Sequence, residues 1–341
     1  MTSAAPAEAR ARRRDVTGTP PHPVTAEDHA LGRTADRPGR IPLAGWWSVL
    51  RRVWREASSD HLPMVAASCA FYALLALFPA LSVLISLYGL ALDPSGVESQ
   101  LAVVAGVLPA TTYQMIAQRV HDLASTGQTR LGWRLAFSLM FALWTATAGT
   151  KAMMTALNMT YEEKEKRGFL RFTATAVALT LVGLVGISLA LSIIVGLPAV
   201  LSFTWLGPLA NLALQLVSWA LLLGFLMLGL AMLYRYGPSR AEAKWRWITP
   251  GSLLVAVLWL AASLLFSFYV ANFASYDVTY GSLGAVVVAL MWFYISAFVV
   301  LLGAELNAEL ELQTWRDTTD GSPLPMGERG AFVADHVAAA P

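Results

Sequence analysis

The segment Val299–Glu311, which reads VVLLGAELNAELE, passes within one helical turn from purely apolar residues to a stretch with three carboxylates. Glu305, Glu309 and Glu311 lie where a membrane-spanning helix would end. Carboxylates are unfavourable there, because the helix macrodipole places partial negative charge at the C-terminal end. The segment therefore indicates either a functional site or the place where a membrane helix meets water.

The overall composition favours a membrane protein. The chain has 341 residues, of which 56% are hydrophobic and only 13% are charged. Soluble globular domains carry about 25% charged residues, so this chain is predicted to be an all-α protein that crosses the bilayer several times. The single cysteine, Cys69, and five histidines without the spacing of metal ligands predict neither a disulfide nor a metal site, and no cofactor is expected.

Six stretches are apolar over the roughly 20 residues that a membrane helix needs. They cover residues 63–90, 133–154, 169–195, 205–233, 248–273 and 283–302. The first stretch is long for a straight crossing and contains Pro79, whose missing N–H favours a kink, so a tilted or broken helix is expected. Gly183 and Gly186 in the third stretch predict a close contact with another helix.

The distribution of Lys and Arg predicts the orientation of these spans. All but three of the 24 basic residues fall on the side that carries both termini, and the exceptions are Arg119, Arg130 and Arg134. Cytoplasmic loops carry the excess of Lys and Arg, so both termini are expected in the cytoplasm.

The segments outside the six-helix domain of residues 61–312 are expected to differ in character. Residues 1–43 and 313–341 are poor in large apolar side chains and are predicted to be disordered cytoplasmic tails. Residues 44–60 are predicted to form an amphipathic helix at the membrane interface. Its apolar face would hold Trp46, Trp47, Leu50, Val53, Trp54 and Ala57, and its polar face Arg51, Arg52 and Arg55. The long external loop, residues 93–130, contains a further amphipathic stretch, PATTYQMIAQRVHDLAS, predicted to be either a lid or an inert surface helix.

The chain shows no enzyme motif. It contains no phosphate-binding loop, no nucleotide-binding glycine pattern, no nucleophile elbow and no metalloprotease motif, and no Asp or Glu lies deep in a span. A protein that is not an enzyme is therefore expected. Its arginines follow the membrane topology rather than forming a base-reading surface, so no nucleic-acid partner is expected either.

Polar residues inside the spans are the candidates for a substrate path. They are Tyr72, Asn211, Gln215 and Asn272, and Pro79 is a further candidate because its expected kink lies near Tyr72. Each polar side chain alone is typical of a hydrogen bond between helices, whereas together they would line a weakly polar cavity. A substrate that suits such a cavity is an amphiphile such as a lipid rather than a small ion.

The glutamates of the opening segment have two interpretations. Glu305 is expected about one turn beyond the hydrocarbon edge, where a carboxylate need not be buried, and Glu309 shares its helix face. They would either pair structurally with Lys151 or Arg171, or form a cytoplasmic gate. Lys151, which is expected to extend toward the cytoplasm, and Asn158 are further candidates for the gate or the structural pair.

Three stretches together resemble one family. They are LPMVAASCAFYALLALFPALSVLISLYGL, TALNMTY and YGSLGAVVVALMWFYISAFVVLLGAELNAELE. They are similar to the YihY/virulence factor BrkB family, some of whose members have carried the label ribonuclease BN. The resemblance implies a bacterial inner-membrane protein with about six helices that transports or flips an envelope lipid and supports envelope integrity. Membrane lipids are then its partners. The alternative is a scaffold that docks partners through its cytoplasmic tails, and the oligomeric state stays open.

Overall fold

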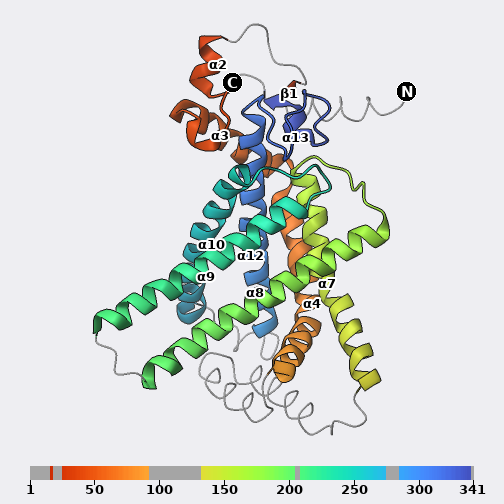
Figure 1. The fold of residues 1–341 in the computed structure, drawn as a ribbon, viewed down its shortest axis with the longest axis vertical. Coiled ribbons are helices and arrows are strands. Elements are labelled where there is room, and N and C mark those ends of the chain that lie inside the picture. The colour runs from red at the N-terminus through yellow and green to blue at the C-terminus, as the bar shows by residue number, and fades with distance from the viewer. Residues whose placement is uncertain (1–15, 18–24, 92–131, 204–207, 274–283, 339–341) are drawn as a thin grey trace.

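The computed structural model describes residues 16–17, 25–91, 132–203, 208–273 and 284–338 (Figure 1). Within these residues the chain is mostly helical, and its six long helices are α4 (Leu62–Ala91), α7 (Gly132–Thr160), α8 (Phe169–Phe203), α9 (Pro208–Tyr236), α10 (Trp245–Phe273) and α12 (Gly284–Leu312). The predicted external loop, residues 93–130, lies outside the described residues.

Five helices are long and apolar enough to cross a membrane, as judged over the described residues. The candidate spans are Leu62–Ala80, Phe169–Ile194, Leu212–Tyr236, Trp245–Val270 and Gly284–Leu312. Helix α7 is as long as the others but is the least apolar of the six, since it contains Arg134, Lys151 and several threonines. The all-helical membrane fold is therefore confirmed, and five of the six predicted spans are found.

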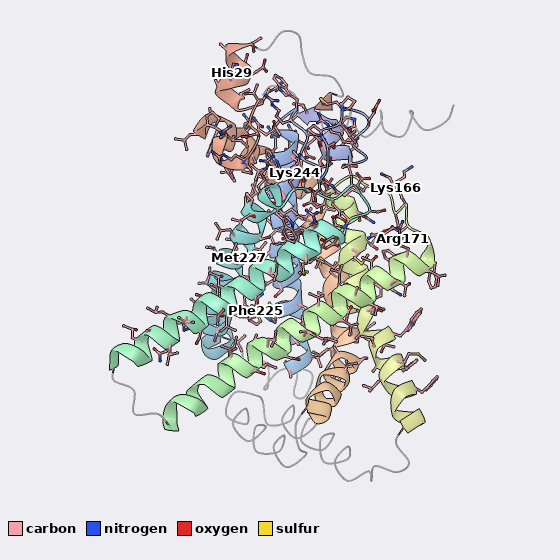
Figure 2. All side chains as sticks on the ribbon, viewed as in Figure 1. His29, Lys166, Arg171, Phe225, Met227 and Lys244 are labelled. Carbon is pink, nitrogen blue, oxygen red and sulfur yellow. The ribbon has the colours of Figure 1, made fainter. Side chains whose placement is uncertain are left out.

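Helix α12 is the central element of the bundle. It packs against α4, α10 and α7, and α8 and α9 form an antiparallel pair that contacts α7 and α10 (Figure 1). The main core lies toward one end of α12, among residues such as Leu157, Tyr234 and Leu301. We call this the capped end, because both described terminal segments gather there. Figure 2 shows His29, Lys166 and Lys244 at this end, whereas Phe225 and Met227 lie midway along α9.

Helices α10 and α12 approach each other most closely at Gly251 and Gly303. A Cβ atom on Gly251 would overlap the carbonyl oxygen of Gly303, and one on Gly303 would overlap the side chain of Val255. The amide of Gly251 donates a hydrogen bond of 2.8 Å to the side chain of Asn307. By contrast, nothing lies within 4 Å of a Cβ on Gly183 or on Gly186, so the predicted close contact at that pair is wrong.

Helix α4 runs unbroken from Leu62 to Ala91 through Pro79. The predicted break at this proline is therefore wrong, and the continuous helix lacks one backbone hydrogen bond there. The carbonyl of residue 75, which would accept from the missing N–H, lies on the outer part of the bundle, where Leu75 itself is 55% exposed.

The prediction of disordered tails is wrong for their described parts. On the N-terminal side, α2 (Ala26–Leu31) begins with a capping box between Thr25 and Asp28 and ends at Gly32 in the left-handed conformation. It is followed by a short 3-10 helix, η1 (Pro38–Arg40). On the C-terminal side, α13 (Phe332–Asp335) precedes β2 (Val337–Ala338), which pairs antiparallel with β1 (Val16–Thr17).

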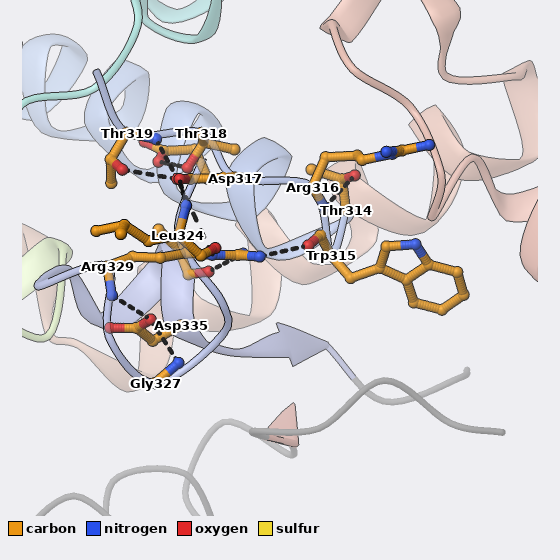
Figure 3. Close-up of polar contacts among 12 residues, drawn as sticks. Thr314, Trp315, Arg316, Asp317, Thr318, Thr319, Leu324, Gly327, Arg329 and Asp335 are labelled. Carbon is orange, nitrogen blue, oxygen red and sulfur yellow. Dashed lines mark hydrogen bonds and ion pairs between the residues drawn. The ribbon is translucent and has the colours of Figure 1, made fainter. Parts of the chain in front are cut away.

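The C-terminal segment is held together around Arg329. This side chain is 6% exposed. It donates hydrogen bonds of 3.0, 2.9 and 2.7 Å to the carbonyls of Leu324, Trp315 and Ala334 (Figure 3). The carboxylate of Asp335 accepts from the amides of Gly327 and Arg329. These bonds satisfy buried polar groups locally, so the segment folds although its composition is poor in large apolar residues.

The same segment is attached to the rest of the chain. The amide of Phe332 donates to the carboxylate of Glu163 at 2.7 Å, and the guanidinium of Arg33 donates to the carbonyl of Ala338 at 3.0 Å. Composition predicts disorder because it considers each segment alone, whereas here each segment supplies partners for a distant one. We refer to residues 25–60 and 313–338 together as the cap.

Helix α3 (Leu43–Ser59) forms the part of the cap that packs on α12, and its bounds agree with the amphipathic helix predicted at residues 44–60. Its buried face includes Ser48, Val49 and Val53. The predicted faces are partly wrong, because Val53 and Arg52 turn toward the protein. The outward stripe is formed by Leu43, Trp47, Leu50 and Trp54.

Candidate functional site

Two features contain several of the predicted site residues. The first is the acidic end of α12, and the second is a groove between α4 and α7. At the acidic end, Glu305, Glu309 and Glu311 are at most 1% exposed. The expectation that Glu305 reaches water at the helix end is wrong, because the cap covers the last turns of α12.

Glu309 pairs with a cation from α3. The guanidinium of Arg52 lies 2.5 Å from the Glu309 carboxylate and also donates to Gln313 at 2.6 Å and to Ser48 at 2.8 Å. The predicted partners, Lys151 and Arg171, are not used for this pair. Arg52 thus joins α3 to α12 and places positive charge at the negative end of the helix dipole.

Glu311 pairs with Arg240, which lies in the loop between α9 and α10. The two guanidinium–carboxylate hydrogen bonds measure 2.9 and 2.6 Å, and Thr318 donates a third bond of 2.6 Å to the same carboxylate. Burial lowers the pKa of Arg240, but the charge and hydrogen bonds of Glu311, together with the charges of Tyr161 and Glu163, outweigh burial, so the net shift is upward. Burial, together with the charge of Glu311, also raises the pKa of the neighbouring Tyr161.

Asn158 joins the end of α7 to the loop that follows α9. Its side-chain oxygen accepts from the amide of Ser239 at 2.7 Å, and its side-chain nitrogen donates to Glu165 at 2.9 Å. Burial raises the pKa of Glu165, but hydrogen bonds from Arg167 and Asn158 outweigh burial and bring it to about 2. These contacts give Asn158 a structural role within the capped end.

The groove lies between the capped-end halves of α4 and α7 and has a cavity volume of about 530 Å³. Most of its lining is apolar, from Met64, Val65, Ala148, Ala152, Ala156 and Met159. Its polar lining consists of Ser68, Tyr72, Lys151 and Thr155, together with the thiol of Cys69. A mostly apolar cavity with a few polar groups has the chemistry of a ligand site.

Lys151 is the cation of this groove. Its ammonium lies 4.4 Å from the ring centre of Trp144 and 5.9 Å from that of Phe169. Trp144 precedes Lys151 on α7, so the side chain extends away from the capped end of this helix. Side chains on a helix tilt toward its N-terminus, which explains the direction.

The structure brings together only some of the predicted path residues. Tyr72 and Lys151 line the same groove, whereas Pro79 is two turns farther along α4 and is absent from the lining. Gln215 is exposed on α9, and the side chains of Asn211 and Asn272 lie outside the described residues. A shared weakly polar path through all five residues is therefore not supported by the described part.

Sequence reasoning missed several residues of both features. The sequence predicts Arg52 only for the polar face of the interfacial helix, and Arg240 only as one of the basic residues that set the orientation. A signal did exist for the groove: Ser68 and Tyr72 are four residues apart on α4, as Lys151 and Thr155 are on α7. Residues four apart share a helix face, so each pair presents its polar groups together.

A second cavity, of about 460 Å³, lies at the capped end near the start of α8 and is lined by several basic residues, including Lys166 and Arg171 (Figure 2). Most of its cations are already paired: Arg167 with Glu165, and Arg235 with both Glu242 and Asp320. The pKa of Asp320 is lowered by its hydrogen bond with Arg235. This arrangement is typical of a structural ion-pair network. Across the described residues, no three His, Cys, Asp or Glu side chains are grouped so that they could hold a metal.

The similarity to known proteins extends over most of the chain. Residues 53–324 match the family model described as virulence factor BrkB. The putative ribonuclease-like protein YfkH of Bacillus subtilis is 31% identical over 273 residues, which cover 77% of this chain and 95% of that protein. A UPF0761 membrane protein of Tolumonas auensis is 29% identical, with 75% and 83% covered, and one of Vibrio vulnificus is 28% identical, with 80% and 85% covered. No solved structure matches the chain.

Proposed function

Because the chain belongs to the virulence factor BrkB family of membrane proteins, we propose that it binds and transports, or flips, an envelope lipid or another amphiphile. In this way it supports envelope integrity. The protein resides in the bacterial inner membrane with both termini in the cytoplasm. The orientation rests on the Lys and Arg residues, and most of those that the structure describes lie toward the capped end.

The α4–α7 groove is the observation that carries this proposal. An amphiphile has an apolar body and a polar end, and the groove offers both kinds of surface within one cavity. Its apolar wall comes from small and flexible side chains such as Ala152 and Met64, and its polar groups include Tyr72 and Lys151. Its volume of about 530 Å³ lies within the range of about 300–1,000 Å³ usual for ligand pockets.

The proposed topology has six spans. Helix α7 packs between α4 and α8, both of which are candidate spans, so it crosses the bilayer with them. Helix α3 then lies along the cytoplasmic interface. Its outward residues Trp47 and Trp54 are 73% and 80% exposed, and such rings favour the headgroup region of a membrane.

The acidic end of α12 closes the cytoplasmic side of the bundle in this proposal. Arg52 on Glu309 and Arg240 on Glu311 fill the space between α12 and the cap, so a substrate cannot leave through that end in the described conformation. A lipid instead enters the groove laterally, from the bilayer. The alternative of a scaffold with free tails has less support, because the described parts of both tail segments pack against the bundle.

The proposal is tested by filling the groove. Ser68 lines the groove and is exposed, so Ser68→Trp adds a large side chain there without entering the core. Ser267→Trp is the matched control, since Ser267 is exposed on α10 outside the groove. Both variants and the wild type are reconstituted in vesicles that contain a fluorescent phospholipid, and its movement between leaflets is followed by chemical quenching from outside.

The wild type and Ser267→Trp are expected to speed the movement above the rate in protein-free vesicles, whereas Ser68→Trp is expected to return it to that rate. Equal rates for Ser68→Trp and the wild type would exclude the groove as the path. A wild type no faster than protein-free vesicles would count against transport itself.

A further inference from the structure

Lys151 differs from the other buried or half-buried cations in the described residues, because each of those either pairs with a carboxylate or, like Lys244, donates to a backbone carbonyl. Arg52, Arg235 and Arg240 each pair with a carboxylate. The described residues place no carboxylate on Lys151, whose ammonium contacts only the rings of Trp144 and Phe169. A lysine at membrane depth normally pairs with an opposite charge or reaches the interface, so this residue is a functional-site candidate.

The aromatic rings do not complete the surroundings of this ammonium. A ring face within about 6 Å attracts a cation, and the Trp144 ring lies well inside that range at 4.4 Å. A ring is not a counter-charge, however, and an ammonium has three N–H donors. The groove therefore keeps positive charge and unused donors on its polar side.

Two hydroxyls that face the same groove have no hydrogen-bond partner among the described residues. The described residues give neither Ser68 nor Tyr72 a side-chain hydrogen bond, although both line the cavity from α4. Across from them on α7, the Thr155 hydroxyl donates to the carbonyl of Lys151 at 3.0 Å. One free cation and two free hydroxyl donors from two helices thus converge on a single cavity.

From this convergence we propose that the groove recognises an anionic, phosphate-bearing headgroup, with Lys151 as the charged ligand and Ser68 and Tyr72 as hydroxyl donors. The inference rests on the proposed function and names its substrate class. A phosphate ester suits this set because its oxygens accept several hydrogen bonds and carry negative charge that can pair with the ammonium of Lys151. A zwitterionic lipid brings its own ammonium toward Lys151 and is disfavoured.

The surroundings favour a lipid over a soluble phosphate ester. Beyond the groove, away from the capped end, α4 exposes Leu75 and Phe78, and α7 exposes Phe141 and Met140. Their side chains are between 55% and 63% exposed, and they continue the groove as an apolar track. An acyl chain attached to a headgroup at Lys151 would lie along this track, whereas a soluble ester would leave it uncovered.

The test measures lipid retention by full-length protein in detergent, using native mass spectrometry. Phosphatidylglycerol and phosphatidylcholine with identical acyl chains are offered in equal amounts, with and without excess inorganic phosphate. The variants are Lys151→Met, which keeps the stem without the charge, and Lys151→Arg, which keeps the charge. Lys164→Met is the matched control, since Lys164 is exposed in the loop between α7 and α8. Ser68→Trp and Ser267→Trp report whether the retained lipid is in the groove.

The wild type, Lys151→Arg and Lys164→Met are expected to prefer phosphatidylglycerol, and Lys151→Met to lose that preference by roughly tenfold, the effect of one charge-assisted hydrogen bond. Ser68→Trp should retain less lipid than Ser267→Trp. If excess inorganic phosphate abolishes the preference of the wild type for phosphatidylglycerol, the result would support the same phosphate site but assign it to a soluble ester.

Two other outcomes separate this inference from the proposed function. If Lys151→Met keeps the full preference, or the wild type retains both lipids equally in a groove-dependent way, the headgroup inference is overturned while lipid binding stands. If no lipid is retained and Ser68→Trp changes nothing in either assay, both proposals fail.

Discussion

Arg240 and Glu311 form a two-pronged ion pair inside the capped end, with hydrogen bonds of 2.9 and 2.6 Å and side chains only 2% and 1% exposed. The two residues come from different elements, the loop after α9 and the last turn of α12. Because both charges are removed from water, each depends on the other to offset its desolvation. The acidic end of α12 is therefore also the place where the loop after α9 is attached to α12.

Removing one member of this pair is expected to be strongly destabilising. Glu311→Gln leaves the Arg240 guanidinium buried without its counter-charge, and such a loss typically costs about 3–5 kcal/mol. The loss of stability is measured by thermal unfolding of the variant and the wild type in detergent. The control is Glu242→Gln, because the Glu242 side chain is 49% exposed where it meets Arg235, and exposed pairs contribute about 0–1 kcal/mol. Similar melting temperatures for the two variants would contradict the assigned role.

Arg52 is expected to hold α3 on α12. Arg52→Met removes its bonds to Glu309, Gln313 and Ser48, and hydrogen bonds to charged groups contribute about 1.5–3 kcal/mol each. Hydrogen exchange of α3 amides should therefore rise by roughly tenfold or more. Arg51→Met is the neighbouring control, since Arg51 is exposed on the same helix. Equal exchange in the two variants would show that α3 is held by its apolar contacts alone.

The parts of this fold that could be predicted are those set by local composition. Apolar runs are properties of short windows, so five spans could be predicted from composition, whereas the family was predicted from the resemblance of three longer stretches. The partners of the α12 glutamates could not be predicted in this way. Lys151 and Arg171, which lie on the same predicted side of the membrane, were expected instead. The actual cations lie 257 residues away for Glu309 and 71 residues away for Glu311.

The groove illustrates the same limit on a smaller scale. Tyr72 and Lys151 were each recognised as polar residues within apolar stretches, but their meeting depends on how α4 and α7 pack. The C-terminal part of the cap was not predicted, because Arg329 and Glu163 stabilise it through backbone groups that composition does not reveal. Backbone hydrogen-bond partners of this kind become known only from coordinates.

The glycines of the bundle are expected to respond unequally to alanine. Gly251→Ala places a methyl group against the Gly303 carbonyl and the Asn307 side chain, and overpacking of this kind costs about 1–3 kcal/mol. Gly183→Ala meets open space on α8 and should be neutral or slightly stabilising, since alanine favours a helix. Melting temperatures of the two variants in detergent measure the difference. A destabilised Gly183→Ala would indicate a helix contact at the predicted place after all.

Acid is expected to loosen the link between α7 and α8 through Glu165. The pKa of this carboxyl is lowered from 4.5 to about 2, with Arg167 and Asn158 as its hydrogen-bond donors. A depressed folded-state pKa means that these bonds add stability above pH 4.5, which is lost progressively as the pH falls toward 2. The melting temperature of the wild type should therefore exceed that of Glu165→Gln at neutral pH, and the gap should narrow over this range. Glu162→Gln in the same loop serves as the control, because this variant keeps the bonds of Glu165 to Arg167 and Asn158. A gap that stays constant down to pH 2 would mean that the Glu165 bonds do not depend on its charge.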